Sequence, residues 1–82
     1  MNISALEVKF DADSMWVVLA DGRTIGVPLT WFPRLLQASE HEREKYEIGT
    51  FGLHWEALDE DISIEALLAG KEDQTKPRRH AA

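Results

Sequence analysis

The first thirty residues alternate between apolar and polar side chains in the manner of β-strands. Leu6, Val8 and Phe10 are separated by single charged residues, a period of two that is typical of a half-buried strand. The polar segment 11–14 predicts a turn, and the continuous apolar run at 15–19 is typical of a central strand. We therefore expect two antiparallel strands at the start of the chain.

A second hairpin is predicted at residues 21–22, because Asp-Gly tolerates the positive φ angles of a two-residue loop. A loop of that length places four side chains on one face of the sheet: Trp16, Val18, Ile25 and Val27. Trp16 is accordingly expected in the core. Val17 and Leu19 then point to the other face, which is expected to be partly covered as well. The three strands form an antiparallel meander.

Helical signals follow the meander. Thr30 is a suitable N-cap, and Pro33 stands in the first turn, where a missing N–H costs little. Phe32, Leu35 and Leu36 have the i, i+3, i+4 spacing of one helix face. This short helix is expected to dock on the sheet.

The middle of the chain predicts a polar helix and then extended structure. Ser39 and Glu42 match a capping box, which predicts a short helix at 41–45. Apolar residues return at intervals between 46 and 55, around two glycines, and they indicate a second, small strand pair.

The last predicted element is a short helix. Ser63 can cap it, Ile62 and Leu67 stand at hydrophobic-staple positions, and Gly70 occupies the position after the C-cap. Its expected buried stripe consists of Ile64, Leu67 and Leu68. So short a helix must pack on the rest of the protein to be stable. The fold class is therefore α+β, with one domain at 1–70.

Length and composition favour a single small domain without covalent cross-links. The 82-residue chain is 44% hydrophobic and 29% charged, ordinary values for a globular protein, and it contains no cysteine. No apolar run approaches the roughly 20 residues of a membrane span. The N-terminus lacks the basic and apolar regions of a secretory signal. We expect a cytoplasmic protein that has no membrane partner.

Charge is distributed unevenly along the chain. Residues 1–70 contain five Lys or Arg and thirteen Asp or Glu, a net charge of −8, whereas residues 71–82 contain four and two, a net charge of +2; together these give −6. An acidic body repels phosphate backbones, so direct binding of nucleic acid by the folded part is not expected. The segment 71–82 has no apolar periodicity and is predicted to be a mobile tail.

Two segments resemble a known family. Residues 31–35, Trp-Phe-Pro-Arg-Leu, and residues 53–68, Leu-His-Trp-Glu-Ala-Leu-Asp-Glu-Asp-Ile-Ser-Ile-Glu-Ala-Leu-Leu, are similar to the bacterial domain of unknown function 2442. The resemblance covers about residues 3–70 and implies a small α+β domain that begins with a β-meander. Some members of this family carry an added helix-turn-helix domain, and others are encoded beside a second small protein, as in a toxin–antitoxin pair. The resemblance supplies no catalytic residues.

The densest cluster of potential metal ligands lies near the last predicted helix. An imidazole and several carboxylates fall within eight residues of one another: His54, Glu56, Asp59, Glu60 and Asp61. The simpler interpretation is a solvated acidic turn whose negative charge favours the helix N-terminus. We therefore assign no metal and no cofactor.

Other catalytic patterns fit poorly. His41-Glu42 begins like a zinc-protease motif, but Lys45 stands where the second histidine is required. Ser39 and Ser63 are both explained as helix caps, so neither is assigned as a nucleophile. We expect no enzymatic activity.

Two functions of different classes remain. The first is a non-catalytic protein-interaction module, an antitoxin-like partner of a neighbouring gene product, whose acidic surface would suit a basic partner. Its candidate surface combines aromatic rings at the ends of elements with nearby charges: Trp31, His54, Trp55, Glu56, Asp59, Glu60 and Asp61. The alternative is a small metal-dependent or hydrolytic enzyme centred on His54 and the acidic turn 59–61. A homodimer through Val17 and Leu19 is a third, weaker hypothesis.

Overall fold

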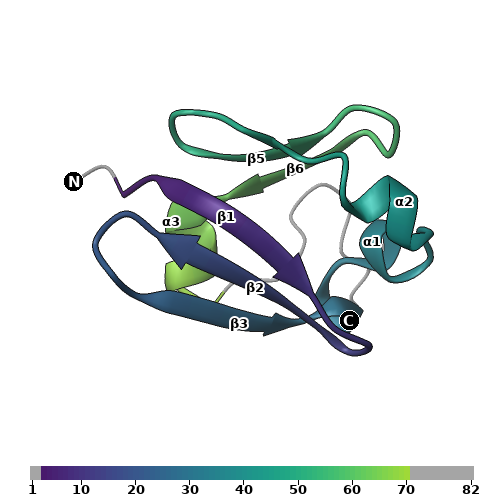
Figure 1. The fold of residues 1–82 in the computed structure, drawn as a ribbon, viewed down its shortest axis with the longest axis horizontal. Helices are drawn as coiled ribbons and strands as arrows, with labels where there is room; N and C mark the ends of the chain where they lie inside the picture. Colours follow the sequence, from purple (N-terminus) through teal and green to yellow (C-terminus); the bar gives the residue numbers. More distant parts are fainter. Residues whose placement is uncertain (1–2, 71–82) are drawn as a thin grey trace, which may run out of the picture.

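The protein is built from two three-stranded antiparallel sheets and a few short helices (Figure 1). The computed structural model describes residues 3–70, and the tail predicted at 71–82 lies outside them. Sheet A contains β1 (Ala5–Phe10), β2 (Ser14–Leu19) and β3 (Thr24–Pro28), in that order. The predicted α+β fold with an N-terminal meander is confirmed.

Sheet B contains β4 (Glu47–Ile48), β5 (Gly52–Trp55) and β6 (Glu60–Ser63). The sequence predicted only a strand pair here. The third strand was missed because it begins with two charged residues, Glu60 and Asp61, that were interpreted as part of a turn. Tight pairing of β5 with β6 instead carries the chain directly into the last helix.

Four short helical segments complete the fold: η1 (Leu29–Trp31), α1 (Pro33–Leu36), α2 (Glu40–Arg43) and α3 (Ile64–Leu68). Figure 1 shows α1 and α2 at one end of the molecule, while sheet B lies beside β1. The last helix contacts both β3 and β5, so it joins the two sheets. Among residues 3–70, the longest helix has five residues, and none is long and apolar enough to cross a membrane.

The β2–β3 hairpin has a three-residue loop, not the predicted two-residue loop. The Leu19 amide donates to the Arg23 carbonyl at 2.8 Å, and Gly22 takes a φ of 97° at the end of the loop. The one-residue difference reverses both faces of β2. Trp16 is therefore 41% exposed and pairs with Gly26, so its predicted core position is wrong.

The same shift buries the residues that were expected on the other face. Val17 and Leu19 lie in the core, which removes the basis for self-association through them. The β1 strand departs from simple alternation as well, because the β1–β2 register shifts between Ala5 and Glu7. Leu6 lies at this bulge and is 62% exposed, contrary to the prediction.

The helix predictions are confirmed in part. Pro33 stands at the first position of α1, but Phe32, not Thr30, is the N-cap. Leu36 is exposed, while Phe32 and Leu35 reach the core. The capping box of Ser39 is present, although α2 begins one residue earlier than predicted and ends at Arg43.

Helix α3 begins and ends as predicted. The Ser63 hydroxyl accepts a hydrogen bond from the Ala66 amide at 3.2 Å. Gly70 has a φ of 77° beyond the C-cap, a conformation that favours glycine. Ile64 and Leu67 are buried, but Leu68 is exposed and so does not belong to the predicted stripe.

The core lies between the two sheets and the helices. It is a single cluster of buried apolar residues drawn from every part of the described chain: Ala5, Val8, Met15, Val17, Leu19, Val27, Leu29, Phe32, Leu35, Leu53, Trp55, Ile62, Ile64 and Leu67. Both sheets therefore share one core.

Candidate functional site

Strand alternation in sheet B separates a buried face from a face that carries ionisable groups. Leu53 and Trp55 on β5 point inward and are buried. His54 points outward and is paired with Glu47 on β4 and Asp61 on β6. This second face therefore gathers an imidazole and carboxylates from all three strands.

His54 is held between two carboxylates. Its Nδ1 lies 2.6 Å from Asp61 Oδ1, and its Nε2 lies 3.5 Å from Glu56 Oε1. The hydrogen bond with Asp61 raises the pKa of the His54 imidazole above its usual value, with smaller contributions from the Asp61 and Glu56 charges. The predicted placement of His54 and Glu56 on one face is confirmed.

Glu47 belongs to this cluster and was missed from the sequence. One ligand atom from each of Glu47, His54 and Glu56 can be chosen so that all three lie within 4.8 Å of one another. The pairing of β4 with β5 brings Glu47 opposite His54, although seven positions separate them in the chain. Only the register of that short hairpin could have indicated the contact.

The three residues of the Asp-Glu-Asp segment have different surroundings. Asp59 has a φ of 53° in the turn before β6, whereas Asp61 faces His54. Glu60 points inward opposite Trp55 and is fully buried. Arg34 reaches this turn from α1, donating to the Asp59 carbonyl at 2.7 Å and lying 3.7 Å from Glu60 Oε1. The predicted solvated acidic turn is therefore wrong for Glu60.

The two tryptophans of the candidate surface differ in accessibility. Trp55 is only 1% exposed, and its Nε1 donates to the Arg43 carbonyl at 2.9 Å. Trp31 is half-buried against the core. Trp55 and Glu60 consequently contribute to folding, and the accessible part of the predicted surface consists of Trp31, His54, Glu56, Asp59 and Asp61.

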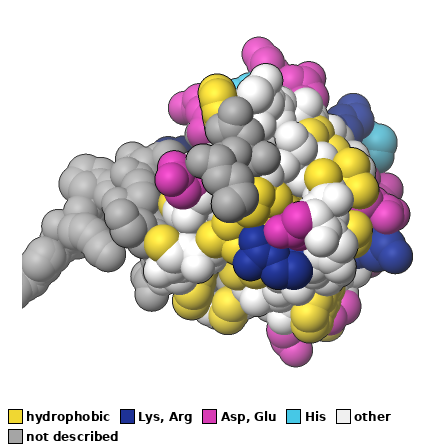
Figure 2. All heavy atoms as spheres, turned by 90° about the vertical axis from the view of Figure 1, so that its left-hand side faces the viewer, with side chains coloured by type: hydrophobic (Ala, Val, Ile, Leu, Met, Phe, Trp, Pro, Cys, Tyr) yellow, Lys and Arg dark blue, Asp and Glu magenta, His cyan; other side chains and the backbone are white. Residues whose placement is uncertain are grey.

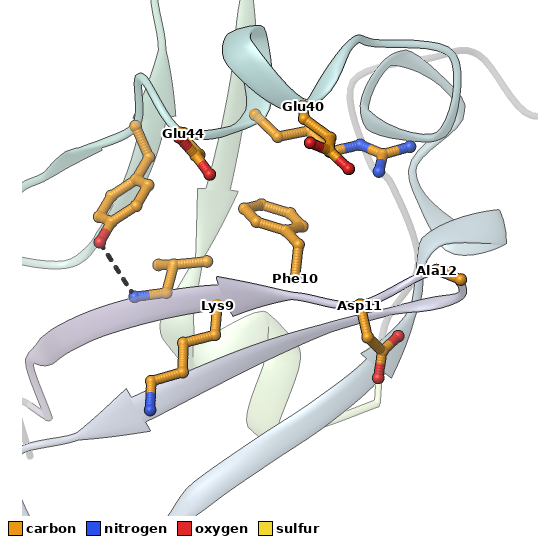
Figure 3. A pocket seen from close by; sticks show the side chains of 9 residues that line it. Lys9, Phe10, Asp11, Ala12, Glu40 and Glu44 are labelled. Atoms are coloured by element: carbon orange, nitrogen blue, oxygen red, sulfur yellow. Dashed lines mark hydrogen bonds between the residues drawn. The ribbon is translucent and has the colours of Figure 1, made fainter.

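A pocket that the sequence did not predict lies between β1 and α2. Its volume is about 680 Å³, and its lining comes from β1, the turn after it, α2 and the segment that follows α2: Val8, Lys9, Phe10, Asp11, Ala12, Glu40, Arg43, Glu44 and Tyr46. Figure 3 shows the Phe10 ring directed toward Glu40 and Glu44, while the Lys9 side chain leads away on the other side of β1. The pocket thus has an aromatic wall and an acidic rim.

Hydrogen bonds fix the two sides of this pocket. The Val8 amide donates to the Tyr46 hydroxyl at 3.3 Å, which joins β1 to the segment that enters sheet B (Figure 3). Arg43 lies over the Phe10 ring at 5.9 Å, but its guanidinium donates to the carbonyls of Leu35 and Leu36. Nε and Nη2 of Arg43 therefore serve the end of α1, and the Glu40 and Glu44 side chains at the rim are exposed.

Acidic groups are also prominent on the wider surface. On the face seen in Figure 2, acidic side chains lie around much of the outline, with hydrophobic side chains between them.

A second hollow, of about 310 Å³, lies over sheet B beside His54. It is lined by Gly49, Phe51, Gly52, Leu53, His54, Asp61, Ile62 and Ser63. Ser39 and Ser63 both accept helix-capping hydrogen bonds, as predicted.

Two solved structures are similar to this chain. A crystal structure of a protein of unknown function from Rhodospirillum rubrum has 31% sequence identity and a TM-score of 0.74, covering 89% of this chain and 93% of that one. The solution NMR structure of the uncharacterised protein CV0863 from Chromobacterium violaceum has 22% identity and a TM-score of 0.75, covering 89% and 71% respectively.

One family model matches most of the chain. No curated protein matches the chain. Residues 5–73 match the family described as protein of unknown function DUF2442. This range includes both sheets and all the helices described above. The chain belongs to the DUF2442 family.

Proposed function

We propose that this protein is a non-catalytic interaction module that binds a basic segment of a partner protein in the pocket between β1 and α2. The observation that carries this proposal is the placement of Glu40 and Glu44 beside the aromatic side chains of Phe10 and Tyr46. A lysine or arginine side chain has an apolar stem and a charged end, and such a pocket suits both parts.

The position of the two glutamates supports a cation as the ligand group. Glu40 begins α2 and Glu44 is its C-cap, so one helical turn separates them and both side chains reach the same rim. Arg43 over the Phe10 ring indicates that this aromatic face tolerates a cation. The stem of a bound basic side chain would lie along Phe10 and Tyr46.

The charge of the whole domain supports a basic partner. Residues 1–70 carry a net charge of −8, which would attract a positively charged protein and increase the rate of its capture. The same charge disfavours direct contact with DNA or RNA. We propose that the partner is a basic, nucleic-acid-acting protein from a neighbouring gene, and that this chain acts on it in the cytoplasm as an antitoxin does.

The test is co-purification of the full chain with the neighbouring gene product, followed by calorimetric titration at low and high salt. The Glu40→Gln/Glu44→Gln double variant should weaken binding at least about tenfold and reduce its salt dependence. Glu7→Gln/Glu65→Gln is the matched control, because it removes the same charge from exposed positions outside the pocket. The absence of any complex, or equal affinities for both double variants, would contradict the proposal.

A further inference from the structure

We propose that Glu47, His54 and Glu56 form a binding site for a divalent first-row transition metal ion, Zn²⁺ in the first instance, on the outer face of sheet B. The inference does not depend on the proposed function, because the pocket between β1 and α2 shares no residue with this cluster. It differs from the site considered from sequence, since Glu60 is buried and Asp59 lies at the turn.

The hydrogen bond to Asp61 prepares His54 to act as a ligand. A carboxylate can only accept, so Nδ1 carries the proton in the 2.6 Å contact with Asp61. Once the Nε2 proton is released, the imidazole presents a lone pair at Nε2, on the side where Glu56 lies. Metal-binding histidines ordinarily donate their second nitrogen to such a group, which fixes the tautomer and orients the ring.

The distances fit tetrahedral coordination. Zinc bonds of about 2.0–2.2 Å to nitrogen and oxygen place neighbouring tetrahedral ligands about 3.4 Å apart. The separation between His54 Nε2 and Glu56 Oε1 is 3.5 Å. One ligand atom of each residue can be chosen so that no two lie more than 4.8 Å apart, and the exposed Glu47 side chain can rotate to bring its carboxylate closer.

The donor set selects the class of ion. An imidazole with two carboxylates suits zinc and its first-row neighbours, whereas calcium and magnesium prefer oxygen ligands alone. Three protein ligands leave one tetrahedral position for water. Because His54 comes from β5 and Glu47 from β4, a bound ion would also link two strands of sheet B.

The test is titration of the chelator-treated full chain with Zn²⁺, followed by calorimetry, and with Co²⁺, followed by its visible spectrum. The wild type should bind one ion and give the intense visible bands of tetrahedral Co²⁺. Glu47→Gln and Glu56→Gln should each weaken binding at least about tenfold, and His54→Gln should abolish it. Asp61→Asn should weaken it about 10- to 100-fold, because Asp61 only orients the ligand.

The matched control is His41→Gln, since His41 is an exposed histidine with glutamates on both sides of it in α2. This variant should bind zinc as the wild type does. In a nitrogen-detected NMR titration, zinc should shift the His54 Nε2 resonance, a readout that needs no variant. The proposal is overturned if zinc produces no heat, if His54→Gln retains the wild-type affinity, or if the His54 ring is unaffected.

Discussion

Sheets A and B have the same number of strands and the same antiparallel order. They differ in what lies closest to their strands: a side chain in sheet A and paired backbone in sheet B. Sheet A faces the core with apolar side chains, and its outer face is covered in part by the Trp16 ring lying on Gly26. Sheet B buries Glu60 and brings its backbone into close contact at Gly52. A side chain can move to relieve a contact, whereas paired backbone cannot. Sheet B should therefore tolerate substitution less well.

The two glycines give the largest contrast. A Cβ at residue 52 would lie 2.2 Å from the Ile62 carbonyl oxygen, while one at residue 26 would meet the Trp16 ring at 2.4 Å. Gly52→Ala must separate β5 from β6 and should lower the free energy of unfolding by about 4 kcal/mol. Gly26→Ala only displaces an exposed ring and should cost about 1 kcal/mol. Urea denaturation of both variants measures the difference; equal losses would contradict this account of the two sheets.

Two arginines, one beside each sheet, provide a second contrast. Arg34 holds the Asp59 carbonyl and lies beside the buried Glu60 carboxylate, so Arg34→Ala should cost about 2 kcal/mol. Arg23 pairs with Asp21 on an exposed hairpin of sheet A, and Arg23→Ala should cost about 0.5 kcal/mol or less. Thermal unfolding of both variants in low and in high salt is the measurement. If Arg23→Ala lost more stability than Arg34→Ala, the buried Glu60 carboxylate would not be the reason for the contribution of Arg34.

The smallest effect is a pH dependence that arises in sheet A. Hydrogen bonds from the Trp16 indole and from the amides of Asp13 and Ser14 lower the pKa of Asp11 below its ordinary 3.8. Because the folded-state pKa is the lower one, the stabilisation is complete above 3.8 and is lost as the pH falls through the folded value. Asp11→Asn should reduce the acid dependence of the urea midpoint between about pH 5 and pH 2.

The control for this pH dependence is Asp13→Asn. It changes an exposed carboxylate in the same turn but keeps the backbone N–H that donates a hydrogen bond to Asp11. An unchanged pH profile in Asp11→Asn would contradict the assignment. The fluorescence of Trp16 should respond to Asp11→Asn as well, because the indole loses its carboxylate partner.

Local signals predicted some ends of elements, since caps depend on residues near in sequence. Ser39, Ser63 and Gly70 were all placed correctly for this reason. The faces of β2 were predicted wrongly because one extra residue in the loop at 20–22 shifts the register of the hairpin by one residue. Nothing in the local pattern distinguishes the two loop lengths, as Asp-Gly suits both.

The candidate sites were predictable only where they followed strand alternation. The sequence placed His54 and Glu56 on one face, but Glu47 entered through strand pairing and the pocket through the contact of α2 with β1. Glu60 was misplaced because a charged residue is ordinarily exposed, and its burial depends on Arg34 arriving from a separate helix. These contacts join residues distant in the chain, and a single sequence contains no record of them.

The order of the strands has a consequence for folding kinetics. Neighbouring strands in each sheet are also consecutive along the chain, so residues 5–28 and 47–63 each complete a sheet without a crossover. Loop-closure entropy is small for such pairings, and proteins dominated by them fold quickly. The slow step in folding should then be the docking of sheet A on sheet B, which is completed when α3 contacts both β3 and β5.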